Sequence, residues 1–226
     1  MHIKAILFDI DGTLVDSNEA HVEAWQRAFR AEGFEMSRET IREQIGKGGD
    51  NLVPSLLPDL PEDIRERLSQ AEGEIYRRDY LPDVRPFPGG KEILRAAAAA
   101  GQQVILASSA SRPEVDHYIG LLDARDILSG TTSKDDVGHS KPCPDIFAAA
   151  LERSGCRPEE VIVVGDTPYD IEAAHGAGLS AVAVLSGGFS RERLQSSGAI
   201  AVYTDVAAIL AQYETSPLGT RQSVSA

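Results

Sequence analysis

The chain has 226 residues, 42% of them hydrophobic, which suffices for one large domain or one domain with an insertion. Acidic residues outnumber basic ones by 35 to 22, and the formal charge of −13 should repel nucleic acid and anionic membranes. Only two cysteines occur, without metal-ligand spacing, and neither a basic leader nor about 20 consecutive apolar residues is present, so we expect a cytoplasmic protein with no nucleic-acid or membrane partner.

The first predicted element is a short buried strand over residues 3–8, followed directly by Asp9, Asp11 and Gly12. Residues two apart in an extended chain point the same way, so both carboxylates should face the crevice beyond the strand's carboxyl end. Two like charges so close need a cation or a shared proton. A hairpin turn or a helix cap is the alternative explanation of an Asp-Gly pair.

The next part of the chain, as far as residue 83, is predicted to contain helices and loops but no strand. The glycine-rich stretch Gly46-Lys47-Gly48-Gly49 should be a flexible loop, and the proline- and glycine-rich residues 81–90 should return the chain to the sheet. Apolar spacing and capping residues predict helices over residues 17–30, 37–45, 50–57 and 61–80.

Beyond residue 90, helices and strands alternate with short loops, which implies an α/β fold with a parallel sheet covered on both faces. We expect residues 16–83, called the cap segment below, to form an inserted domain over a core built from residues 1–15 and 84–226. Residues 214–226 should be frayed. The predicted helices cover residues 90–100, 113–121, 144–154, 168–177 and 206–213, and the strands cover residues 104–107, 161–164, 181–185 and 199–203.

Side chains suited to catalysis recur where the predicted strands end. Ser108 follows the second strand, Lys141 lies in a loop before a proline, and Asp166 follows the third strand, with Asp170 four residues later. Each has an ordinary explanation, because serine and aspartate cap helices and lysine is common in solvated loops. Their order after the paired aspartates of the first strand favours a single active site instead.

In this order the motifs resemble those of the haloacid dehalogenase superfamily, in particular its phosphatase and phosphomutase branch with a helical cap after the first strand. The resemblance covers the whole chain except the tail. It implies a doubly wound, Rossmann-like parallel sheet with an inserted all-helical cap, and Mg²⁺-dependent chemistry on a small phosphorylated metabolite. The matching motifs are Asp9-Ile10-Asp11-Gly12-Thr13, Ser108, Lys141-Pro142, and Gly165-Asp166 with Asp170.

The resemblance also implies a role for each residue. Asp9 would attack the phosphorus and form an aspartyl-phosphate, and Asp11 would protonate the leaving group and then deprotonate the hydrolytic water. These roles require Asp11 to hold a proton while Asp9 does not. Ser108 and Lys141 would hold the phosphoryl oxygens.

Mg²⁺ would be bound by Asp9, the main-chain carbonyl of Asp11, and Asp166, with Asp170 supporting this shell. His21 resembles a histidine that poises the sugar hydroxyl in β-phosphoglucomutase, although it could equally pack near the hinge. Lys47 would reach the distal end of the substrate, unless it is a solvated loop residue. The residues expected to contact the substrate are Gly12, Thr13, His21, Lys47, Ser109 and Arg112.

Departures from the mutase pattern favour hydrolysis of a sugar phosphate or phosphoglycolate. Such mutases carry Lys-Asn just past the motif serine, where this chain has Ser111-Arg112, and a basic residue late in the cap, where residues 70–74 are acidic. A sugar phosphomutase and an inactive metabolite-binding protein are the alternatives, and the sequence leaves monomer and homodimer open. The basic residues available for a second phosphate are Lys47, Arg77, Arg78 and Arg112.

Overall fold

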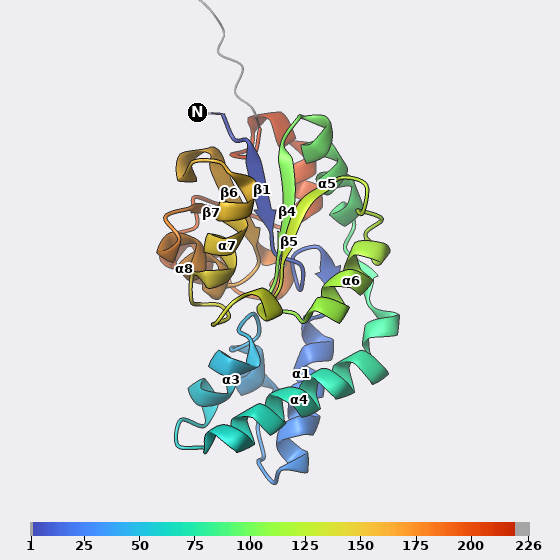
Figure 1. The fold of residues 1–226 in the computed structure, drawn as a ribbon, viewed down its shortest axis with the longest axis vertical. Coiled ribbons are helices and arrows are strands. Elements are labelled where there is room, and N and C mark those ends of the chain that lie inside the picture. Colours follow the sequence, from blue (N-terminus) through green and yellow to red (C-terminus); the bar gives the residue numbers. More distant parts are fainter. Residues whose placement is uncertain (1, 220–226) are drawn as a thin grey trace, which may run out of the picture.

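The computed structural model describes residues 2–219, and a six-stranded parallel sheet forms its centre (Figure 1). The strands are β1 (Ala5–Phe8), β4 (Gln103–Ala107), β5 (Leu128–Thr132), β6 (Val161–Gly165), β7 (Ser180–Val184) and β8 (Ala201–Tyr203), in the order β5-β4-β1-β6-β7-β8. Later strands are therefore added on both sides of β1. The carboxyl end of β1 is the position where sheets of this kind bind ligands. The predicted α/β, doubly wound, Rossmann-like fold is confirmed.

Helices cover both faces of this sheet. Successive residues of a strand point to opposite faces, so Ile6 and Phe8 of β1 join one apolar cluster while Ala5 and Leu7 join the other. In Figure 1, α5 and α6 lie on one side of the strands and α7 and α8 on the other. The helices of this part are α5 (Gly90–Ala99), α6 (Arg112–Leu121), α7 (Asp145–Ser154), α8 (Pro168–Gly176), α9 (Arg191–Ser196) and α10 (Val206–Ala211).

The cap segment lies beyond the carboxyl ends of the strands and has an apolar cluster of its own, which includes Val22, Trp25 and Phe29 (Figure 1). The crevice beyond β1 thus lies between the cap segment and the core, and Ala24 and Tyr76 of the cap segment also join one of the apolar clusters of the sheet. The domain boundaries themselves stay a prediction. The helices of the cap segment are α1 (Asn18–Ala31), α2 (Arg38–Arg42), α3 (Gly49–Leu56) and α4 (Glu62–Asp79).

The two connections between core and cap segment pair with each other. β2 (Val15–Asp16) and β3 (Arg85–Pro86) form a two-stranded antiparallel sheet, so the predictions of a strand-free segment from residue 16 and of a plain return linker are corrected. Single helical turns of the 3-10 type complete the described elements. They are η1 (Leu81–Asp83), η2 (Lys134–Asp136), η3 (Pro158–Glu160), η4 (Leu185–Gly187) and η5 (Tyr213–Thr215).

Three further features differ from the sequence prediction. β5 was not expected, because an edge strand with the sequence Leu-Ser-Gly-Thr-Thr lacks the apolar run of the inner strands. The short helix α9 was not predicted either, because it buries only Leu194 and so lacks an apolar face. The prediction of a frayed tail is wrong for residues 214–219, because Ser216 and Leu218 are buried, and residues 220–226 lie outside the described residues.

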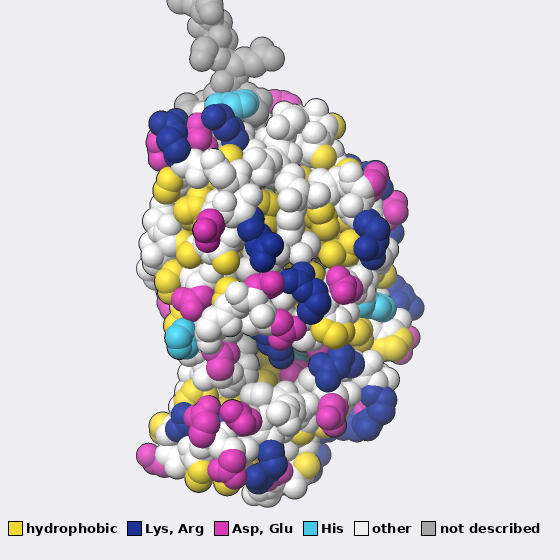
Figure 2. Space-filling view, viewed as in Figure 1, with side chains coloured by type: hydrophobic (Ala, Val, Ile, Leu, Met, Phe, Trp, Pro, Cys, Tyr) yellow, Lys and Arg dark blue, Asp and Glu magenta, His cyan; other side chains and the backbone are white. Residues whose placement is uncertain are grey.

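Charged side chains of both signs cover the visible surface. Acidic and basic side chains are intermingled across the face shown in Figure 2, over both the sheet and the cap segment. Among the described helices, none combines the length and the apolar character needed to span a membrane.

Candidate active site

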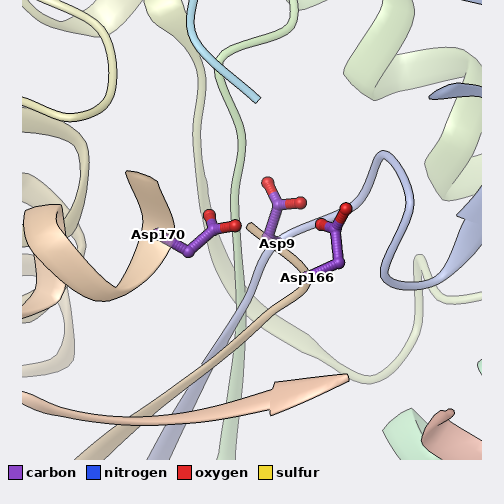
Figure 3. Close-up of side chains that lie close together, drawn as sticks. All are labelled: Asp9, Asp166 and Asp170. Atoms are coloured by element: carbon purple, nitrogen blue, oxygen red, sulfur yellow. The ribbon is translucent and has the colours of Figure 1, made fainter. Parts of the chain in front are cut away.

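Three aspartates converge at the carboxyl edge of the sheet (Figure 3). Asp9 and Asp166 leave the sheet side by side, because β1 and β6 pair with Phe8 opposite Val164. Asp170 lies in the first turn of α8. One carboxylate oxygen from each of the three residues lies within 4.8 Å of the others, and all three side chains are buried.

Lys141 is the cation of this cluster. Its Nζ donates to Asp9 and lies 2.7 Å from Asp170 Oδ1, and its side chain is only 1% exposed. Burial lowers the pKa of Lys141, but the carboxylates of Asp170 and Asp9 outweigh that effect and raise its pKa above the usual value. Two carboxylates therefore bind one buried ammonium group, and the carboxylate of Asp166 lies beside them.

The charge of this cluster is incompletely balanced. Burial raises the pKa of Asp9 to about 7, with Lys141 acting in the opposite direction, and burial together with Asp170 raises the pKa of Asp166 well above its usual value. A divalent cation would offset the excess negative charge, and carboxylate oxygens are the ligands that such hard cations prefer. The residues present fit a metal ion.

Local contacts hold Asp166 in place for such a role. Thr13 Oγ1 donates to Asp166 Oδ1 at 2.8 Å, and Asn18 Nδ2 donates to Asp166 Oδ2 at 3.0 Å. A Cβ atom on Gly12, whose φ is +75°, would lie 2.2 Å from Asp166 Oδ2, and one on Gly187 would lie 1.8 Å from it. The backbone passes so close to the carboxylate of Asp166 at these two positions that only glycine fits there.

Asp11 lies beside this cluster and has other partners. Its carboxylate accepts hydrogen bonds from Ser17 Oγ at 2.6 Å and from Tyr118 OH at 2.7 Å, and more weakly from Ser108 Oγ at 3.4 Å. Ser17 is the N-cap residue of α1, but its hydroxyl makes no cap hydrogen bond and binds Asp11 instead. Asp11 is thus held by donors from both the core and the cap segment.

The pKa order of the two aspartates is the reverse of the sequence prediction. Burial raises the pKa of Asp11, but hydrogen bonds from His21, Ser17 and Tyr118 outweigh it, and the pKa falls below its usual value. The pKa of Asp9 is raised to about 7, mainly by burial. A cation bound to Asp9 would lower the pKa of that carboxyl again.

His21 connects Asp11 to the cap segment. Its Nε2 lies 3.4 Å from Asp11 Oδ1 and its Nδ1 lies 2.9 Å from Glu72 Oε1, while its ring stacks on Tyr76 at a centroid distance of 3.7 Å. Burial lowers the pKa of His21, but Asp11 and Glu72 raise it more strongly, to about 10. The imidazolium therefore sits between two carboxylates.

A cleft between the core and the cap segment opens onto these groups. The core side includes Ser109 and Lys134, and the cap side includes Trp25, Lys47 and Glu72. Asp9, Asp11, His21 and Ser108 also line it. A substrate in this cleft would contact the aspartates and the cap segment at the same time.

The comparisons with known proteins agree with this geometry. The sequence model of the family described as haloacid dehalogenase-like hydrolase matches residues 6–184. The chain belongs to this family. The superfamily that the motifs resembled is thereby confirmed.

Relatives of the chain in this family carry enzyme names. The phosphoglycolate phosphatase of Rhodospirillum rubrum is 27% identical over 215 residues, covering 91% of this chain and 89% of that protein. Protein CbbY of Cereibacter sphaeroides is 32% identical over 217 residues, covering 87% of this chain and 90% of that protein. The crystal structure of a hydrolase from Pseudomonas syringae has a TM-score of 0.88 at 29% identity, covering 94% of this chain and 98% of that one.

For this haloacid dehalogenase-like hydrolase, the structure brings together the side chains expected to act in catalysis and three of the six expected substrate contacts. His21, Lys47 and Ser109 line the cleft. Thr13 is fully buried behind it and donates to the carboxylates. Arg112 points to Thr131 and Asp136 instead of the cleft.

The other residues expected at the site lie as follows. The main-chain carbonyl of Gly12 accepts a hydrogen bond from Ser186 at 2.6 Å. Asp170 accepts hydrogen bonds from both the main-chain N–H and the hydroxyl of Thr167, at 3.0 and 2.7 Å, in addition to its contact with Lys141.

Sequence reasoning missed several residues of the site. Glu72 was noted only as part of an acidic stretch, and nothing in the spacing links it to His21, which is 51 residues away. Tyr118 and Lys134 carry no motif and reach the site only through the folding of α6 and η2. A single buried tyrosine and a single exposed lysine give no periodic signal in one sequence.

Proposed function

We propose that the protein is a Mg²⁺-dependent phosphatase that hydrolyses a small phosphorylated metabolite through an aspartyl-phosphate. The family and the names of the relatives confirm the class of enzyme, a phosphatase that acts on phosphorylated metabolites. The observation that carries the proposal is the buried cluster of Asp9, Asp166, Asp170 and Lys141, which borders the cleft through Asp9.

In this mechanism, Asp9 attacks the substrate phosphorus while the bond to the leaving oxygen breaks. The negative charge of a bound phosphate raises the pKa of Asp11 from the low value set by its hydrogen-bond partners. Asp11 then passes a proton to that oxygen and later takes one from the water that attacks the aspartyl-phosphate. Inorganic phosphate leaves and the carboxylate of Asp9 is restored. Ser108 and Lys141 hold the phosphoryl oxygens, and their positions beside Asp11 and Asp9 support these roles.

Asp9, Asp166 and the main-chain carbonyl of Asp11 would hold Mg²⁺, and Asp170 would support them through Lys141. The bound metal offsets the repulsion between the anionic nucleophile and the anionic phosphate. Thr13 and Asn18 keep Asp166 oriented for this task.

The pairing of the basic residues considered for a second phosphate supports hydrolysis rather than mutase activity. A mutase has to grip a second phosphate, and Glu72 and Glu114 place carboxylates along the cleft. Lys47 donates to Gln44 and Ser55 instead of standing free. The other basic residues considered for a second phosphate are also paired, Arg77 with Glu114, Arg78 with Asp79 and Arg112 with Asp136.

We further propose that the substrate is a sugar phosphate or phosphoglycolate and that residues 16–83 act as a cap domain. The separate apolar cluster of the cap segment supports that division. We propose a cytoplasmic location, which the free thiols of Cys143 and Cys156 support.

The test is release of phosphate from p-nitrophenyl phosphate and from a panel of phosphorylated metabolites, with Mg²⁺ or with EDTA. We expect Asp9→Asn to lower kcat by at least about 10³-fold, since it removes the nucleophile. Asp59→Asn, an exposed charge change in the cap segment, is the control. Hydrolysis that survives EDTA and Asp9→Asn would refute the proposal.

A further inference from the structure

The glycine-rich loop of the cap segment, residues 46–50, lies against the core at two places. A Cβ atom on Gly48 would lie 2.4 Å from Ser140 Oγ, and one on Gly46, whose φ is +104°, would lie 2.6 Å from Thr167 Cγ2. Larger residues could not bring the loop so close. The glycines therefore permit a contact between cap segment and core, a role different from that of a free flexible loop.

Ser140 is held on every polar atom by this part of the cap segment. Its main-chain N–H donates to Asp50 Oδ2 at 2.9 Å, and its hydroxyl donates to Asp50 Oδ1. The same hydroxyl accepts a hydrogen bond from the main-chain N–H of Gly48 at 2.9 Å. The main-chain carbonyl of Ser140 accepts one from Asn51 Nδ2 at 2.9 Å. Ser140 is buried, so these bonds replace water.

Ser140 and Thr167, the core residues that lie against Gly48 and Gly46, are neighbours of the catalytic cluster. Ser140 directly precedes Lys141, whose Nζ lies between Asp9 and Asp170. Thr167 donates its hydroxyl to Asp170 Oδ2 at 2.7 Å. The loop thus borders both segments that bring Lys141 and Asp170 within 2.7 Å of each other.

We propose that Asp50 is a positioning residue, which acts through Ser140 to fix the segment that delivers Lys141 to Asp9 and Asp170. The catalytic part of this inference rests on the proposed phosphatase activity. Asp50 itself does not line the cleft, and its carboxylate binds both donors of Ser140 at once. A residue that holds a catalytic side chain from behind affects turnover more than substrate affinity.

The experiment compares Asp50→Ala and Asp50→Asn with Asp59→Ala, a matched change at an exposed position of the cap segment. Steady-state kinetics with p-nitrophenyl phosphate give kcat and KM. Hydrogen exchange of the peptide that contains residues 139–143, and the rate at which an amine reagent labels Lys141, report on the segment without any turnover.

We expect Asp50→Ala to lower kcat about 10-fold with a smaller change in KM, in the range typical for removing an outer-shell partner. Exchange at residues 139–141 and labelling of Lys141 should both become faster. Asp50→Asn, which keeps one acceptor oxygen, should be intermediate, and Asp59→Ala should match the wild type.

The inference is overturned if Asp50→Ala exchanges and labels like Asp59→Ala, or if it raises KM and leaves kcat unchanged. If the wild type hydrolyses no phosphoester, the proposed function fails, while exchange and labelling still decide whether Asp50 orders the Lys141 segment. If Asp50→Ala does not fold, Asp50→Asn decides the same question by the same three measurements.

Discussion

Asp9 and Asp11 are separated by one residue, yet their surroundings give them opposite properties. Asp9 faces Lys141 and two other buried carboxylates, and burial raises its pKa to about 7. Asp11 faces His21 and two hydroxyl donors, and its pKa falls below the usual value. The pKa values of two chemically identical side chains are therefore set by the groups that the fold places around them.

Lys134 gives a residue-scale prediction about substrate choice. Its exposed side chain lines the cleft, and no ion pair of Lys134 occurs within residues 2–219. We expect Lys134 to contact the carboxylate of 2-phosphoglycolate. Lys134→Met should then raise KM for this substrate by about 2- to 5-fold, because an exposed charge contact is worth about 1 kcal/mol or less. KM for p-nitrophenyl phosphate, which has no carboxylate, should change less.

Steady-state kinetics of both substrates check this prediction, with Lys91→Met on α5 as the control, since Lys91 does not line the cleft. Equal KM values of the variant and the wild type for 2-phosphoglycolate would contradict it.

Residues with a fixed place after a strand could be predicted from the sequence, whereas residues that reach the site across the cleft could not. Asp9 and Asp166 follow apolar strands, and parallel strands place such residues at one edge. Glu72 reaches the site from the long helix α4, and Lys134 reaches it from a single turn after an edge strand. The position of Glu72 depends on how the cap segment packs on the core, and that of Lys134 depends on a core turn that follows a strand without an apolar run.

Among the elements, the inner strands carry a stronger sequence signal than the edges. β1 and β6 are buried along their whole length and read as continuous apolar runs. β5 pairs on one side only, and its serine, glycine and threonines resemble a loop. The sequence therefore predicts the centre of the sheet, which holds the catalytic residues, better than its margin.

Glu160 gives an element-scale prediction about pH. It joins the start of β1 to the turn before β6, because Lys4 Nζ lies 2.8 Å from Glu160 Oε1 and Arg157 Nη2 lies 3.0 Å from it. Hydrogen bonds from Arg157 and Lys4 lower the pKa of Glu160 from 4.5 to about 2. A lowered folded-state pKa stabilises the protein above pH 4.5, and this stabilisation is lost as the pH falls toward 2.

We therefore expect Glu160→Gln to lower the free energy of unfolding at pH 7, by an amount that shrinks between pH 4.5 and pH 2. Urea unfolding at pH 7, 5 and 3.5 measures this difference, and Glu152→Gln, an exposed position on α7, is the control. A difference that stays constant across these pH values would count against the assignment.

At the scale of the whole molecule, residues 2–219 contain three apolar clusters. Two lie on opposite faces of the sheet, and the third lies within the cap segment. Leu218 belongs to one of the sheet clusters, and its carbonyl accepts a hydrogen bond from Gln102 Nε2 at 2.7 Å. The end of the described chain is thus part of the core, although its composition resembles that of a tail.

Truncating this side chain should cost stability. We expect Leu218→Ala to lower the free energy of unfolding by about 2–5 kcal/mol, as for other fully buried leucines. Ile200→Ala, at a position that is 55% exposed, should change it by about 0.5 kcal/mol or less. Urea denaturation followed by circular dichroism compares the two, and equal effects would show that residues 214–219 add nothing to the core.

The short pairing of β2 with β3 has a consequence for how this enzyme can be altered. Val15 lies opposite Pro86 and Asp16 opposite Arg85, so the polypeptide departs from the sheet and rejoins it at adjoining points. An insert of another length or shape can be spliced between these points without changing the path of any central strand. Grafting a library of foreign lids at this junction is therefore a direct route to new substrate ranges with the same phosphate chemistry.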